Sequence, residues 1–220
     1  MKRVKLIALT IALCWNIPFV TANDQWYQVD LVVFRYTNNA SGELWPAVTD
    51  RDLPDNVIPL HNSGDSDDAY VSLPAQDMLL NEQSSALGQK GGYQVLAQRA
   101  WRMPVSGNSP PVAIRASIDG QEPLLLDGTV TVSMERFLHV DVDLWLNKLA
   151  PANIYGSQNM MFEEDIVEES GPLVKLHEGS APMRIVENFQ LKQRRRIKSS
   201  KDVHYLDSPE IGVLVKLTPV

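Results

Sequence analysis

The sequence predicts a single α+β domain, built on a mostly antiparallel β-sheet with one or two helices and two long surface excursions. The first observation behind this is the alternation from Leu138 to Leu146, where every second residue is apolar, as expected of a half-buried strand. The second is that one segment has helical signals, whereas several others are rich in β-branched and aromatic residues. The third is the order of these segments, β–α–β followed by hairpin-like strands, which is typical of α+β folds.

The other expected strands are apolar or alternating runs bounded by Gly, Pro, Asn and Asp, which favour turns. In the strand over 137–146, His139, Asp141 and Asp143 fall on the face opposite the apolar residues. Glu135-Arg136 forms the turn that pairs this strand with the one before it. The remaining strand-like segments are 26–36, 93–102, 112–118, 128–134, 189–198 and 212–217.

The best candidate for a helix is 74–87. Pro74 suits a first turn, Asp77 suits the positive N-terminal end, and Gly88 suits the position just after a helix.

Two segments, 37–72 and 150–182, are rich in Gly, Pro, Asn and acidic residues and are expected to be surface excursions. The strands before and after each excursion are too few to build separate cores, which favours one domain. The acidic run Asp65-Ser66-Asp67-Asp68 lacks the Gly and Glu of a calcium-binding EF-hand loop. We therefore interpret it as a solvated loop and expect no metal site.

Residues 1–22 have the pattern of a secretory signal peptide, with a basic start, an apolar middle and the small-residue site Val20-Thr21-Ala22. We expect the mature domain to comprise residues 23–220, to lie in the periplasm, and to have no membrane-spanning segment. Cys14 is the single cysteine, so the mature chain would have neither disulfide nor thiol nucleophile. The formal charge of −7 argues against nucleic acid as the partner.

The acidic chain has one strongly basic segment, in which six of the ten residues from Lys192 to Lys201 are Lys or Arg. On a strand, the cations Lys192, Arg194, Arg196 and Lys198 would share one face. Arg195 would lie on the other face, with Leu191 and Ile197. The four cations would either bind an external anion or balance Asp141 and Asp143 across the sheet; both alternatives remain open from the sequence.

Aromatic residues complete the candidate binding set. Tyr205 follows the basic segment, and Trp101 ends the strand over 93–102. Both rings could stack on a sugar, although a large ring such as that of Trp101 is also typical of a core.

Catalytic and cofactor motifs are missing from the sequence. The four His residues have no metal-ligand spacing, and neither a G-x-S-x-G motif nor a Gly-rich phosphate loop is present. Asp141 and Asp143 form a pair of carboxylates that could act on a glycan, but exposed strands commonly carry such charges. We therefore expect no enzyme activity and no cofactor.

Four segments together resemble the CsiV family of periplasmic peptidoglycan-binding proteins. The C-terminal run RRRIKSSKDVHYLDSPEIGVLV carries most of the resemblance, and the others are WYQVDLVVF at 26–34, GYQVL followed by AWR within 92–102, and LHVDVDLWL at 138–146. The resemblance implies peptidoglycan binding and a role in cell shape. It further implies support of a bifunctional penicillin-binding peptidoglycan synthase through its outer-membrane lipoprotein activator.

Three functions are consistent with these observations. The first is a non-enzymatic peptidoglycan-binding protein that uses Lys192, Arg194, Arg196, Lys198, Tyr205 and Trp101. The alternatives are a peptidoglycan hydrolase that uses Asp141 and Asp143, and an adaptor that contacts proteins alone.

Overall fold

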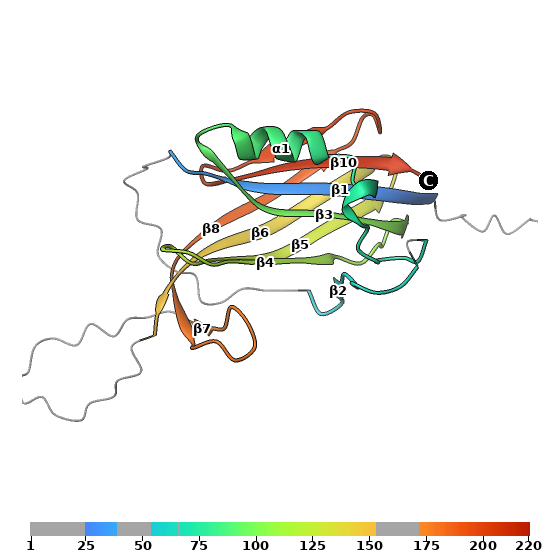
Figure 1. Ribbon diagram of the computed structural model, residues 1–220. Helices are drawn as coiled ribbons and strands as arrows, with labels where there is room; N and C mark the ends of the chain where they lie inside the picture. The colour runs from blue at the N-terminus through green and yellow to red at the C-terminus, as the bar shows by residue number, and fades with distance from the viewer. Residues whose placement is uncertain (1–24, 39–53, 66, 153–171) are drawn as a thin grey trace, which may run out of the picture.

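A computed structural model describes residues 25–38, 54–65, 67–152 and 172–220, and shows two packed β-sheets with one α-helix (Figure 1). Three parts of the chain lie outside the described residues: the predicted signal peptide, residues 39–53 and 66 of the first excursion, and residues 153–171 of the second. The described strands pair antiparallel, except for one short parallel pair. The predicted α+β class with a mostly antiparallel sheet is confirmed.

The first sheet, sheet A, has four strands in the order β3-β1-β10-β9. The central strand β1 (Gln25–Tyr36) pairs with β3 and β10 on its two sides. The other strands are β3 (Tyr93–Val105), β9 (His204–Asp207) and β10 (Ile211–Pro219).

The second sheet, sheet B, has six strands in the order β2-β4-β5-β6-β8-β7. Its long central strands β5, β6 and β8 run side by side, so that residues far apart in sequence become neighbours. The six strands are β2 (Ile58–Pro59), β4 (Val112–Ile118), β5 (Leu124–Met134), β6 (Leu138–Pro151), β7 (Leu173–Val174) and β8 (Met183–Arg196).

The inner faces of the two sheets form one hydrophobic core. Alternate residues of β1, such as Leu31, pack in the same cluster as alternate residues of β6, such as Val142 and Leu144. The sequence patterns predict this arrangement, because residues two apart on a strand point to the same face. The polar residues of β6 consequently lie on the outer face of sheet B.

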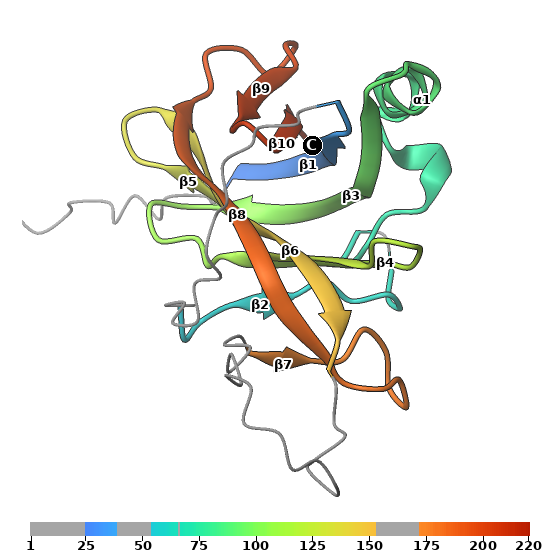
Figure 2. The same ribbon diagram turned by 90° about the vertical axis from the view of Figure 1, so that its left-hand side faces the viewer.

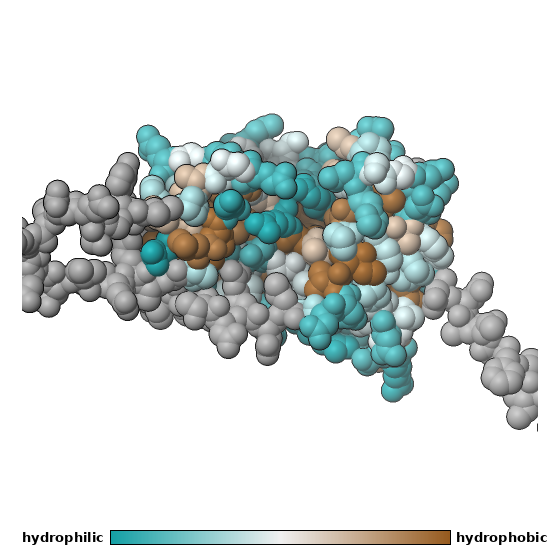
Figure 3. Space-filling model, turned by 90° about the horizontal axis from the view of Figure 1, so that it is seen from below, coloured by the Kyte–Doolittle hydropathy of each residue, from teal (hydrophilic) through white to brown (hydrophobic). Residues whose placement is uncertain are grey.

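The β7 end of that outer face is covered, whereas the rest is more open. Leu125, Leu149 and Ile185 form a small second cluster there, against which Val174 and Leu176 pack. Figure 2 shows β7 and α1 at opposite ends of the molecule. Seen from the side opposite α1, the surface is largely hydrophilic, with apolar side chains gathered in separate patches (Figure 3).

The predicted helix over 74–87 is wrong in its bounds. The structure has a 3-10 turn at Ala75–Asp77 (η1) and a separate helix α1 at Asn81–Gln89, with extended backbone at Met78 between them. The N–H of Leu79 donates to the Oδ1 of Asp30 at 2.7 Å, so a tertiary hydrogen bond takes the place of a helical one. Sequence signals for helix ends are local and do not include such a partner.

Asp30 is a buried carboxylate that fixes η1 on the outer face of sheet A. It is 1% exposed, and Gln28 Nε2 donates both to its Oδ2 at 3.0 Å and to the Asp77 carbonyl at 2.8 Å. Burial raises the pKa of Asp30, while the hydrogen bonds from Leu79 and Gln28 and the charge of Lys216 partly oppose the rise.

The raised pKa of Asp30 predicts a specific pH dependence of stability. A group with a raised folded-state pKa contributes stability that is complete below its unfolded pKa and is lost as pH rises through the folded pKa. The difference in unfolding free energy between wild type and Asp30→Asn should therefore be most favourable to wild type below pH 3.8, and should decrease as pH rises. Denaturant titrations of both proteins measure it, and a difference that grows with pH would contradict this assignment.

Candidate functional site

The pairing of β6 with β8 brings the predicted basic residues beside the predicted acidic ones. Asp143 lies opposite Lys192 and Asp141 lies opposite Arg194 in the register of the two strands. On its other side, β6 pairs with β5, which places Thr129 opposite Asp143 and Thr131 opposite Asp141. Two rows of three side chains therefore cross the outer face of sheet B. We call these six residues the polar grid: Thr129, Asp143 and Lys192 in one row, and Thr131, Asp141 and Arg194 in the other.

The polar grid lines a shallow surface depression. Its volume is about 290 Å³, and its lining consists of the six grid residues together with Val142 and Gln193. Strands in a sheet are about 4.8 Å apart, and residues two apart on one strand are about 6.7 Å apart. The charged groups of the grid are thus spaced for contacts with one small polar ligand group.

The row that contains Asp143 holds a close ion pair. Lys192 Nζ lies 2.9 Å from Asp143 Oδ2, and Gln190 Nε2 donates to Asp143 Oδ1 at 2.8 Å. The Lys192 side chain is 72% exposed, so the ion pair is open to water. Pairs of this kind contribute about 0–1 kcal/mol to stability.

The row that contains Asp141 is looser. Arg194 Nε lies 3.7 Å from Asp141 Oδ1, which is beyond a good hydrogen bond. Arg194 instead donates to Glu135 Oε1 at 3.1 Å. Burial raises the pKa of Asp141, with Arg194 and His139 opposing the rise and Glu135 adding to it. Asp141 is therefore a carboxylate whose charge is incompletely balanced by its neighbours.

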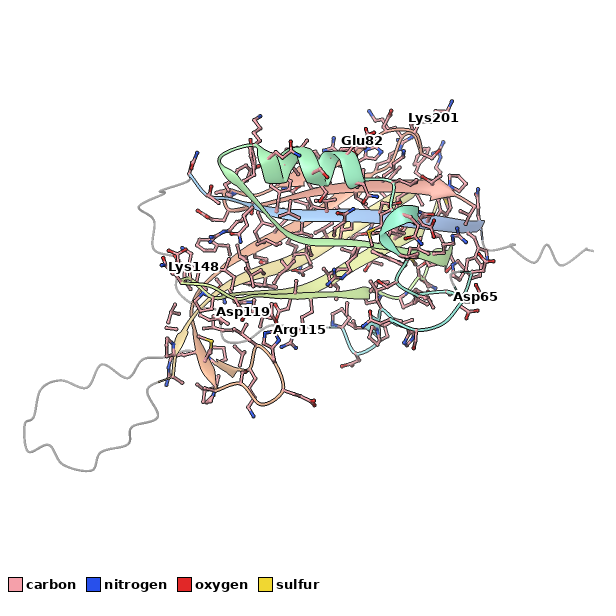
Figure 4. The ribbon with its side chains drawn as sticks, viewed as in Figure 1. Asp65, Glu82, Arg115, Asp119, Lys148 and Lys201 are labelled. Carbon is pink, nitrogen blue, oxygen red and sulfur yellow. The ribbon has the colours of Figure 1, made fainter. Side chains whose placement is uncertain are left out.

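The remaining predicted cations lie towards the end of β8. The Arg196 guanidinium stacks on the Phe137 ring, 3.2 Å from its centroid, which is a cation–π contact. Lys198 is exposed in the connection to β9, and among the described residues it has no ion pair. Figure 4 shows Lys201, in the same connection, at the opposite end of the molecule from Lys148. Because Lys148 pairs with Glu187 near the start of β8, the strand spans most of the molecule.

Arg195 lies opposite Val140 in the register of β6 and β8, on the face of Leu191 and Ile197 as the alternation predicts. Both apolar residues are buried, but Arg195 is exposed. It lies next to the end of β8 at Arg196, where the connection to β9 begins. The inner face of sheet B is therefore open to water at this position.

Tyr205 lies on the other sheet, in an aromatic cluster. The residue is 39% exposed, and its ring stacks on that of Phe34 with centroids 6.4 Å apart. Its hydroxyl bonds to that of Tyr36, and Tyr93 packs edge-on against Phe34. Burial, followed by the Tyr36 hydroxyl, raises the pKa of Tyr205. The cluster provides a partly exposed aromatic surface on sheet A.

Gly212 makes room for this cluster. It lies opposite Phe34 in the register of β1 and β10, and a Cβ at this position would lie 2.3 Å from the ring of Phe34. The cluster could not be inferred from sequence, because its rings come from the three strands β1, β3 and β9. One sequence feature lies beside the cluster: the pair Gly91-Gly92, which precedes Tyr93. The Gly92 carbonyl accepts a hydrogen bond from Thr37 N at 3.0 Å, which joins the end of β1 to the start of β3.

Trp101 is not part of any surface. It is 0% exposed and belongs to the core between the sheets, where its Nε1 donates to Met103 Sδ at 3.3 Å. A ring in this position cannot stack on an external sugar, so the sequence-based candidate is corrected to a core residue. The alternation of β3 places Trp101 on the inner face, opposite Val29 of β1.

The described residues contain no cluster of His, Cys, Asp and Glu that could hold a metal ion. Within the same residues, no helix has the length and apolar character needed to cross a membrane.

Comparison with known proteins identifies one family. A family model described as "Peptidoglycan-binding protein, CsiV" matches residues 5–220, which is nearly the whole chain. No curated protein matches the chain, and no solved structure does.

Proposed function

The chain belongs to the CsiV family of peptidoglycan-binding proteins, and from this premise we propose that it is a non-enzymatic periplasmic protein that binds peptidoglycan through the outer face of sheet B. The observation that carries the proposal is the polar grid, where Lys192 and Arg194 line an exposed depression. Peptidoglycan is rich in carboxylates, on its stem peptides and on the lactyl groups of its sugars. Arg and Lys bind such groups by charge-assisted hydrogen bonds.

Arg196 and Lys198 extend this surface along β8. Arg196 keeps its charge while stacked on Phe137, and Lys198 is exposed. Tyr205 offers a separate contact on sheet A, because its exposed ring can stack on the apolar face of a sugar.

The geometry favours binding over hydrolysis. In a glycosidase, two carboxylates flank the bond that is cleaved, and one of them is protonated. Here Asp143 is held by Lys192 and Gln190. Burial raises the pKa of Asp141, but the Arg194 guanidinium, 3.7 Å away, opposes that rise. Both carboxylates are thus placed to hold cations. The family further suggests that binding supports cell-wall synthesis through a bifunctional penicillin-binding synthase and its outer-membrane lipoprotein activator, and co-purification of the protein with that activator tests this link.

Sedimentation with purified sacculi tests the proposed function. We expect the protein to pellet with sacculi at low salt, and the bound fraction to fall as salt rises, because exposed charges are screened over about 8 Å at physiological ionic strength. The supernatant should contain no released muropeptides. Absence of pelleting would favour a protein-only adaptor, and released fragments would favour a hydrolase.

A further inference from the structure

The polar grid contains two cations and two carboxylates, which limits the ligands that fit it. Asp141 and Asp143 face Lys192 and Arg194 across the same depression. A simple anion that approaches the two cations is repelled by the two carboxylates. A simple cation that approaches the two carboxylates is repelled by the two cations. A ligand end that carries an ammonium and a carboxylate together satisfies both pairs.

We propose that the polar grid binds the free ammonium–carboxylate end of a diamino dicarboxylic acid residue, such as meso-diaminopimelate, in the stem peptide of peptidoglycan. This inference rests on the proposed function and states which chemical group the site recognises. The carboxylate lies between Lys192 and Arg194, and the ammonium lies against Asp141 and Asp143.

The looser row supplies the room for this ligand. Arg194 Nε and Asp141 Oδ1 are 3.7 Å apart, so a carboxylate can approach Arg194 Nε without breaking a tight hydrogen bond to Asp141, while Arg194 keeps its bond to Glu135 Oε1 at 3.1 Å. Asp141 gains an ammonium partner, and burial has already made its charge costly. The side chains of Thr129 and Thr131 also line the depression, and each hydroxyl can both donate and accept a hydrogen bond.

The two ligand charges make the site selective. A lysine-type stem peptide has the ammonium but lacks the adjacent carboxylate. A cross-link or an acetyl group on the amine removes the ammonium charge, and amidation removes that of the carboxylate. Loss of either charge leaves one pair of grid residues without a partner, and a charge-assisted hydrogen bond to a ligand is worth about tenfold or more in affinity. The site therefore distinguishes free stem ends from modified ones.

Titration calorimetry with defined muropeptides tests the proposal. The probes are the disaccharide tetrapeptide with a free diaminopimelate end, the same compound after N-acetylation, and its lysine-containing counterpart. We expect the free diaminopimelate compound to bind at least about tenfold more tightly than either of the others, because it alone supplies both charges. Equal affinities for the three compounds would overturn the inference.

A charge-exchange variant separates recognition from stability. Asp143→Lys combined with Lys192→Asp keeps a cross-strand ion pair but exchanges the positions of its cation and its carboxylate. We expect this protein to melt within a few degrees of wild type and to lose the preference for the free diaminopimelate end. If the grid is a structural charge ladder, the exchanged protein retains wild-type affinity for every probe, and the inference fails.

Sacculus sedimentation distinguishes failure of this inference from failure of the proposed function. If wild type pellets with sacculi but does not discriminate among the three muropeptides, the inference is wrong and the proposed function stands. If wild type does not pellet at all, both are wrong.

Discussion

Replacement of Lys192 and Arg194 by glutamate is expected to reduce sacculus binding to background while the melting temperature falls by only a few degrees. The binding loss follows from the grid, because reversal converts both cationic positions into carboxylates that repel stem-peptide carboxylates. Each charge-assisted hydrogen bond lost costs about 1.5–3 kcal/mol of binding free energy.

The small change in stability follows from exposure. The side chains of Lys192 and Arg194 are 72% and 49% exposed, and such surface ion pairs contribute about 0–1 kcal/mol each. For a domain of this size, a change of 1 kcal/mol corresponds to about 2–4 °C in melting temperature. Thermal melts and sacculus pull-downs on the same preparation measure both quantities.

Arg195→Glu with Lys201→Glu is the matched control. These two substitutions change the net charge by the same amount as the grid variant. Both residues are exposed, but neither lines the depression. The control should therefore retain most of its binding at physiological salt. Equal binding losses in both double variants would show that net charge, and not the grid, governs binding. A fall of more than about 10 °C in the grid variant would show that the ion pairs are structural.

The strands could be predicted from sequence because their two faces differ in environment. In β6, the apolar residues from Leu138 to Leu146 face the core and the polar ones face outward, so the period of two is directly visible. The helix was less predictable, because the bond from Leu79 to Asp30 joins residues 49 positions apart. Local propensity contains no term for such a contact.

The candidate site could be predicted in part. Alternation placed Lys192 and Arg194 on one face and suggested acidic partners, and the register of β6 and β8 pairs them with Asp143 and Asp141. The contribution of Thr129 could not be inferred, because it depends on which strand lies on the other side of β6. Exposure was also hard to predict at the ends of strands, as Arg195 illustrates. Alternation gives the face on which a side chain lies, but not whether the opposite sheet extends far enough to cover it.

Trp101 is the residue for which sequence alone allowed two incompatible roles, and its substitution has the largest expected effect on stability. Trp101→Ala should lower the free energy of unfolding by about 3–5 kcal/mol, because it removes a fully buried ring and leaves a cavity between the sheets. At about 2–4 °C per kcal/mol, the melting temperature should fall by roughly 6–20 °C. Whole domains are stable by only about 5–15 kcal/mol, so the variant should be close to the limit of folding.

Trp26→Ala is the control for this substitution. Trp26 lies on the adjacent strand β1 and is 36% exposed, so its removal should cost far less stability than that of Trp101. Denaturant titrations give the unfolding free energies, and sacculus sedimentation below the melting temperature gives binding by the folded fraction. We expect folded Trp101→Ala to bind as wild type does, because the ring has no path to a ligand from inside the core. A variant that keeps wild-type stability but loses sacculus binding would contradict the core assignment and return Trp101 to the binding surface.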